Sequence, residues 1–119
     1  VQELAPEVIA GYNAPFPSED YKAGARIFPS LVPIEPEDPE AINNVKAWKT
    51  LRQWEKPFLT VFGSEDPLMN GAEKAFQKYV PGAQNQKHQT LLAGHFIQEE
   101  KGAELASALL DFYQKNRTH

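Results

Sequence analysis

An aspartate and a histidine each follow a short apolar segment in the second half of the sequence. The segment 57–62 reads PFLTVF and is followed by Asp66, and the segment 88–92 reads HQTLL and is followed by His95. In an open parallel sheet, reacting groups gather just beyond the carboxyl ends of the strands, and neighbouring strands lie about 4.8 Å apart. If both segments are strands, the two side chains are expected within hydrogen-bonding reach. Such a pair is a general base with its orienting carboxylate.

Each of these residues also has an ordinary structural explanation. An aspartate before a proline often stabilises a turn or caps a helix, and a histidine after a glycine is often a surface residue. Their joint occurrence after consecutive predicted strands favours the acid and base. Glu65 is the alternative acid, although its side chain should point away from Asp66. The other histidines, His88 and His119, are expected to be solvated.

The elements that would position the pair follow from apolar spacing, prolines and glycines. They are predicted in chain order as a helix at 4–12, an irregular stretch at 13–39 with one helical turn at 21–27, an amphipathic helix at 39–54, a strand at 57–62, a helix at 71–80, a strand at 88–92 and a helix at 97–116. The irregular stretch is expected because it contains six prolines. The order strand, helix, strand, helix is typical of an α/β protein with a parallel βαβ unit.

Two of the predicted helices have apolar residues at helical spacing. The expected packing face at 39–54 consists of Ile42, Val45, Trp48, Leu51 and Trp54, and that at 97–116 consists of Ala106, Leu109, Leu110 and Tyr113. We interpret both tryptophans as structural.

Composition limits the possible functions. The 119 residues include 12 Lys and Arg against 16 Asp and Glu, so the net charge of −4 gives no electrostatic reason to expect nucleic acid or an anionic membrane as a partner. Cysteine is absent, which excludes disulfides and thiolate chemistry. No metal-ligand cluster, phosphate loop, membrane span or targeting segment is evident. We expect a soluble, cytoplasmic protein without metal or cofactor that acts on a small molecule. Its oligomeric state cannot be predicted.

Five stretches of the sequence resemble one enzyme family. They are 11–17 (GYNAPFP), 21–26 (YKAGAR), 28–33 (FPSLVP), 62–67 (FGSEDP) and 93–99 (AGHFIQE). The first three are similar to the segment that leaves the cap domain of haloalkane dehalogenases, and the last two resemble that family's acid and histidine motifs. The resemblance extends over nearly the whole chain. The proline-rich part is the most specific, since an acid and a histidine occur throughout the α/β hydrolases.

The resemblance implies the carboxy-terminal portion of an α/β-hydrolase fold. Residues 1–35 would be the end of a helical cap and a return segment, and 36–119 would belong to the core. In the implied reaction, an Asp nucleophile displaces halide from a small halogenated aliphatic substrate. Water activated by His95 then hydrolyses the alkyl-enzyme ester, with Asp66 as the acid of the triad. The chain order of acid before histidine agrees with this fold.

The resemblance also implies an apolar substrate pocket. Its residues would be Phe16, Pro17, Leu68, Met69 and Phe96, although all five could instead be core residues. The first residue is Val1, so we expect the nucleophile and the halide-binding tryptophans upstream in a longer reading frame. The 119 residues alone should then be inactive and marginally stable or prone to associate. Alternatives are another α/β hydrolase, such as an epoxide hydrolase or esterase, and a non-catalytic fragment.

Overall fold

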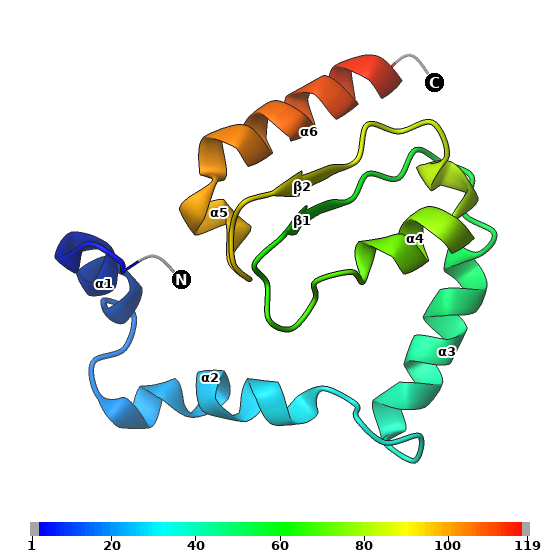
Figure 1. Cartoon of the computed structure of the whole chain (residues 1–119). Coiled ribbons are helices and arrows are strands. Elements are labelled where there is room, and N and C mark those ends of the chain that lie inside the picture. Colours follow the sequence, from blue (N-terminus) through cyan, green and yellow to red (C-terminus); the bar gives the residue numbers. More distant parts are fainter. Residues whose placement is uncertain (1–2, 118–119) are drawn as a thin grey trace. The chain divides into compact units, whose positions relative to one another are not determined.

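The computed structural model describes residues 3–117, which divide into two compact units at residues 47 and 48 (Figure 1). The first unit is helical, and the second contains the sheet. Helix α3 (Pro39–Leu51) begins in the first unit and ends in the second. No helix in this part of the chain is long and apolar enough to cross a lipid bilayer.

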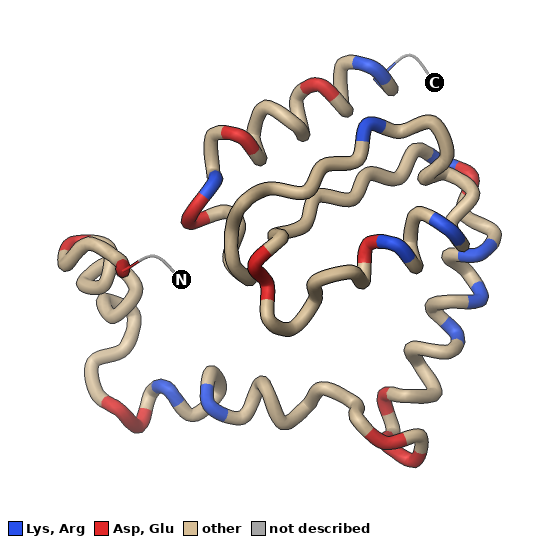
Figure 2. Tube along the Cα trace, viewed as in Figure 1, with Lys and Arg blue, Asp and Glu red and all other residues tan. Residues whose placement is uncertain are grey.

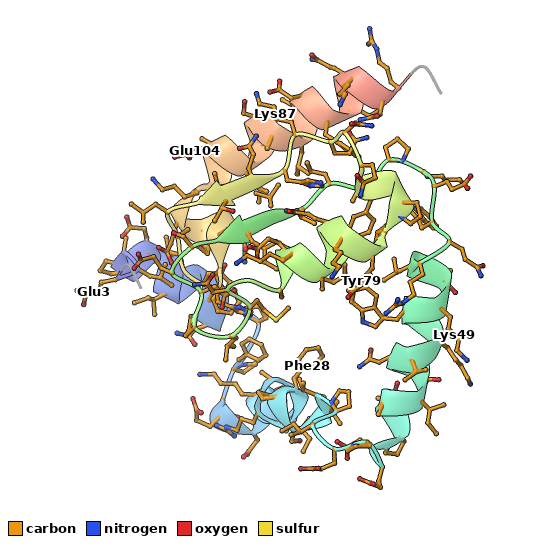
Figure 3. The ribbon with its side chains drawn as sticks, turned by 45° about the vertical axis from the view of Figure 1, so that its right-hand side comes forward. Glu3, Phe28, Lys49, Tyr79, Lys87 and Glu104 are labelled. Atoms are coloured by element: carbon orange, nitrogen blue, oxygen red, sulfur yellow. The ribbon has the colours of Figure 1, made fainter. Side chains whose placement is uncertain are left out.

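The first unit consists of short helices. They are α1 (Pro6–Asn13), the 3₁₀ turn η1 (Glu19–Lys22), α2 (Ala23–Ile27), the 3₁₀ turn η2 (Phe28–Leu31) and the start of α3. The expected helix near 4–12 is present, but 19–31 is more helical than predicted. The reason is that prolines at the start of an element, such as Pro29, do not interrupt it, because the first helical N–H groups need no partner. Phe28, which is labelled in Figure 3, is 71% exposed.

The second unit contains a sheet of two parallel strands, β1 (Val61–Gly63) and β2 (Gln89–Leu91), with Phe62 opposite Thr90. Between them lie α4 (Glu73–Tyr79) and the 3₁₀ turn η3 (Pro81–Ala83). The predicted parallel βαβ order is therefore confirmed, although both strands are shorter than expected. Strand β1 is short because the backbone before it finds other partners: Phe58 N–H donates to Gly82 O over 2.9 Å, outside the ladder.

Helix α4 covers one side of the strand pair (Figure 1). Its Phe76 is the centre of an aromatic cluster. The Phe76 ring lies 5.0 Å from that of Trp48, 5.9 Å from that of Phe58 and 6.4 Å from that of Phe62. Such contacts bury large apolar areas, with the Trp48 and Phe58 rings stacked on Phe76 and the Phe62 ring tilted. Val80, directly after α4, is fully buried. Trp48 thus has the structural role predicted for it.

The face predicted for α3 is only partly buried. Trp48 and Leu51 are half-buried, whereas Ile42 and Val45 are 59% and 58% exposed, and Trp54 lies beyond the end of the helix. The helix stops at Leu51, three residues before the predicted end. Trp54 O instead accepts a 2.7 Å hydrogen bond from Gly82 N–H.

The predicted helix at 97–116 is two helices, α5 (Ile97–Glu100) and α6 (Gly102–Asn116). The break is at Lys101, whose backbone is not helical (φ −137°, ψ 39°). Helix α6 lies along the side of the sheet opposite α4 (Figure 1). Glycine at position 102 weakens continuation of a helix, because it has the largest conformational entropy to lose. The expectation of one continuous helix was wrong.

The packing face predicted for the terminal helix was also wrong. Leu109, Leu110 and Tyr113 are 51%, 59% and 64% exposed. Ala108 is buried instead, and it lines a small cavity together with Phe112 and residues at the start of β2. Leu105, Ala108 and Phe112 also have helical spacing, so the helix has two apolar stripes. Periodicity alone cannot choose between them.

His88 is half-buried and hydrogen-bonded, contrary to the expectation that it is solvated. Its Nδ1 lies 3.1 Å from Thr60 N and 3.0 Å from Thr60 Oγ1, and its Nε2 lies 2.8 Å from Ala83 O. Because Thr60 N–H is a donor and Ala83 O an acceptor, Nδ1 accepts and Nε2 donates. The ring therefore joins the start of the sheet to η3. His119 lies outside the described residues.

Candidate functional site

Asp66 and His95 are joined by a hydrogen bond at the carboxyl end of the two strands. Nδ1 of His95 lies 2.9 Å from Oδ2 of Asp66. An ionised carboxylate can only accept, so Nδ1 holds the proton and Nε2 of the neutral ring is the acceptor. The proximity predicted from strand order is confirmed. This is the arrangement by which an acid holds a histidine in the tautomer of a general base.

The loop after β1 is hydrogen-bonded to the end of β2 and to the loop that follows β2, which fixes the separation of the pair. Ser64 N–H donates to Leu91 O over 2.8 Å, and Glu65 N–H donates to Ala93 O over 3.0 Å. Gly63 permits this close approach, because a Cβ at that position would lie 2.4 Å from both Ala93 O and Gly94 O. Parallel pairing thus continues past the last strand residues into the site.

Asp66 is 6% exposed, and both its carboxylate oxygens are hydrogen-bonded. Oδ1 accepts from Leu68 N–H over 2.8 Å and from Met69 N–H over 3.0 Å, while Oδ2 contacts His95. Burial opposes ionisation, but the hydrogen bonds from Leu68, His95 and Met69 outweigh it and hold the pKa of Asp66 below its usual range. The turn-stabilising and histidine-orienting explanations therefore both apply, each through a different oxygen.

Glu65, the alternative acid, is exposed, and Asp66 is the carboxylate hydrogen-bonded to His95. Figure 2 shows this acidic pair in the turn directly after β1. The geometry favours Asp66 as the orienting acid.

The histidine lies at the rim of a shallow hollow. The His95 side chain is 40% exposed, and Phe96 meets its ring edge-on at 5.1 Å. Besides the acid and the base, the hollow is lined by Met69 and Ile97 and by the three residues of β1. An apolar hollow next to a general base can hold an apolar substrate beside a water molecule.

The five predicted pocket residues have different positions. Met69 lines the hollow, Phe96 lies against His95, and Leu68 is 74% exposed with its N–H bound to Asp66. Phe16 is half-buried and Pro17 exposed, both in the first unit, so their role in a pocket stays a prediction.

Sequence reasoning did not identify Ile97 or Glu100. Ile97 lines the hollow, and Glu100 Oε1 accepts a 3.2 Å hydrogen bond from Gly94 N–H. The only available signal for Glu100 was a carboxylate shortly after the histidine loop, where acidic side chains can bind unpaired backbone N–H groups.

A parallel strand pair between helices, with an acid and a histidine at its carboxyl edge, is compatible with an α/β hydrolytic enzyme. The chain is 50% identical over 112 residues to the haloalkane dehalogenase of Mycobacterium marinum, which is 94% of this chain and 38% of that protein. It is 49% identical over 114 residues to that of Mycolicibacterium paratuberculosis and 47% identical over 117 residues to that of Psychrobacter cryohalolentis. No protein-family model matches.

The predicted resemblance to haloalkane dehalogenases is confirmed by these similarities. They cover 94%, 96% and 98% of this chain. The chain spans only 38% to 39% of the length of these relatives, a share that is consistent with a carboxy-terminal portion.

Proposed function

We propose that the chain is the carboxy-terminal part of a haloalkane dehalogenase with an α/β-hydrolase fold. In this proposal His95 is the general base and Asp66 its orienting acid. The observation that supports it is the 2.9 Å hydrogen bond between Nδ1 of His95 and Oδ2 of Asp66. It occurs in a chain 47% to 50% identical to proteins named haloalkane dehalogenases.

The first chemical step would use an aspartate outside these 119 residues. One of its carboxylate oxygens attacks the carbon that bears the halogen, a carbon–oxygen bond forms, and halide leaves with the electron pair of the carbon–halogen bond. The product is an alkyl-enzyme ester. Neither Asp66 nor His95 needs to change its protonation state in this step.

The second step would depend on His95. Nε2 takes a proton from water while the water oxygen attacks the carbonyl carbon of the ester, and collapse of this adduct releases the alcohol and restores the carboxylate. Asp66 stabilises the imidazolium that forms. The ring then gives up its proton, so the net products are alcohol, halide and one proton.

Small halogenated aliphatic molecules and water are the proposed substrates. Within the second unit, Leu68, Met69 and Phe96 would contribute apolar surface around the histidine. Phe16 and Pro17 are proposed as substrate-binding residues from the resemblance alone. Haloalkanes offer little to hydrogen-bond, so an apolar lining suits them. Residues 1–35 are proposed as the end of a cap and 36–119 as core.

Other α/β hydrolases share an acid and a histidine in this order, so an epoxide hydrolase or esterase uses a similar pair. The similarity to proteins named haloalkane dehalogenases over most of the chain supports the dehalogenase instead.

A chimera tests the proposal. This chain would replace the matching segment of the Mycobacterium marinum relative, and halide release from a bromoalkane would be followed in single and multiple turnovers. We expect steady turnover with wild-type His95. With His95→Gln we expect about one halide per protein and then no further release, because displacement does not need the histidine but ester hydrolysis does.

Two controls complete the experiment. Glu65→Gln changes the charge next to Asp66 and should leave turnover within about twofold, since surface substitutions have small effects. The 119 residues alone should release no halide. Continued steady turnover by the folded His95→Gln chimera would refute the assignment of the base, and a folded wild-type chimera without halide release would refute the proposed activity.

A further inference from the structure

Glu100 binds the backbone on both sides of the histidine. Its side-chain Oε1 accepts a 3.2 Å hydrogen bond from the N–H of Gly94, the residue before His95. Its own N–H donates over 3.4 Å to the carbonyl oxygen of Phe96, the residue after His95. One residue of α5 therefore binds backbone groups of both residues next to His95 in the chain.

Gly94 is suited to this contact in two ways. It is buried, so its N–H needs a partner within the protein. It also has no Cβ, and a Cβ at this position would lie 2.9 Å from Oε1 of Glu100. The side chain of any other residue at position 94 would therefore crowd the carboxylate of Glu100.

The opposite side of the same loop is held by the first strand. Ala93 O accepts from Glu65 N–H over 3.0 Å, and Gly63 packs against the carbonyl oxygens of Ala93 and Gly94. The loop is therefore fixed by β1 on one side and by Glu100 on the other. A shift of the loop away from β1 would lengthen the hydrogen bond between His95 Nδ1 and Asp66 Oδ2.

We propose that Glu100 is a positioning residue for His95: by binding Gly94 N–H, its carboxylate holds the loop at the distance that the hydrogen bond to Asp66 requires. The inference rests on the proposed function only in taking His95 as the base. Glu100 would act on His95 through the loop.

The test uses the ¹⁵N-labelled chimera described above and the nuclear magnetic resonance signal of its His95 Nδ1–H group. Glu100→Gln and Glu100→Leu form a matched pair, because both are neutral and similar in size but only Gln keeps an oxygen that can accept from Gly94. We expect Glu100→Leu to speed exchange of the Gly94 amide and of His95 Nδ1–H with water by about tenfold, and Glu100→Gln by less than about threefold.

Two references separate positioning from general loss of structure. The Val80 amide is fully buried and donates to Phe76 O over 3.0 Å, so its exchange should be the same in all variants. Glu104→Ala removes an exposed carboxylate 3.3 Å from Lys101 at the same helix junction, labelled in Figure 3, and should leave the His95 signal unchanged. Gly94→Ala displaces the carboxylate from the other side and should reproduce the effect of Glu100→Leu.

Unchanged His95 Nδ1–H exchange in both Glu100→Leu and Gly94→Ala would overturn the proposal. So would faster exchange of His95 and Val80 by the same factor, because that is general unfolding. The readout needs no catalysis. If the chimera releases no halide but His95 exchange depends on Glu100, only the proposed function fails. If the chimera is active and exchange does not respond, only the positioning role fails.

Discussion

Gly63 and Ala93 approach each other so closely that a Cβ on the glycine would lie 2.4 Å from the alanine carbonyl oxygen. Gly63 is the last residue of β1, and Ala93 begins the loop that contains His95. The distance between the acid loop and the base loop therefore depends on the absence of one methyl group.

Replacing Gly63 with alanine should destabilise the protein by about 1–3 kcal/mol, because the clash is with backbone, which cannot rotate away. Urea unfolding of the chimera measures this. Gly102→Ala is the control: an added Cβ there meets nothing within 4 Å, so we expect no destabilisation, and a gain of at most about 1 kcal/mol from the lower entropy of the unfolded chain. Equal midpoints for the two variants would contradict the close packing at Gly63.

Asp66→Asn should leave the protein folded but slow ester hydrolysis in the chimera by about 10⁴-fold, because an amide no longer holds the histidine in the required tautomer. Single-turnover halide release should survive, since displacement does not use this pair. The measurement is the ratio of the initial burst rate of halide release to its steady-state rate. Wild-type turnover in folded Asp66→Asn would point to Glu65 or to an acid elsewhere.

Acid should destabilise the protein in part through Asp66. Burial opposes ionisation of Asp66, but hydrogen bonds lower its folded-state pKa below the unfolded value of about 3.9. The unfolded chain therefore binds the proton more readily. The stabilisation is fully present above the unfolded pKa and is lost as pH falls through the folded pKa.

Thermal melting between about pH 5 and pH 2 tests this window. We expect the wild-type melting temperature to fall more steeply below about pH 4 than that of Asp66→Asn, which cannot titrate at this position. Hydrogen bonds from the backbone N–H groups of Glu35 and Ile34 likewise lower the pKa of Asp38. The melting temperature of Asp38→Asn should therefore also fall less steeply with decreasing pH than that of the wild type. Parallel wild-type and Asp66→Asn curves would argue against the lowered pKa of Asp66.

His88→Ala should cost about 1–3 kcal/mol, because Thr60 is 3% exposed and its N–H would lose its acceptor. The ring also connects to Ala83 O, so η3 should loosen. Lys87→Ala is the neighbouring control, an exposed residue labelled in Figure 3, and should change stability by less than about 0.5 kcal/mol. Equal urea midpoints for the wild type and His88→Ala would show that the hydrogen bonds of His88 do not contribute to stability.

The order of elements and the pairing of the acid and base could be predicted from sequence. Apolar runs bounded by glycine and proline identify β1 and β2, and parallel strands joined by a helix bring their carboxyl ends to one edge. Asp66 and His95 follow those ends, so their contact required no knowledge of distant packing. The positions of α3 and α4 were predictable for the same local reasons.

Packing decided the remaining features. Periodicity indicates that α6 has apolar stripes, but only the tertiary structure selects Ala108 over Leu109 for burial. Likewise, a histidine before a strand is solvated unless backbone groups distant in sequence need it, as Thr60 needs His88.

Sequence alone thus determined which residues could form the acid–base pair and the strands that bring them together, because these depend on local periodicity and chain order. Only the tertiary structure decided how the pair is held: by the missing methyl group of Gly63, by the two oxygens of Asp66 and by the carboxylate of Glu100. The physical reason is that hydrogen-bond partners and steric limits depend on distances of a few ångströms between segments, which residue spacing does not specify.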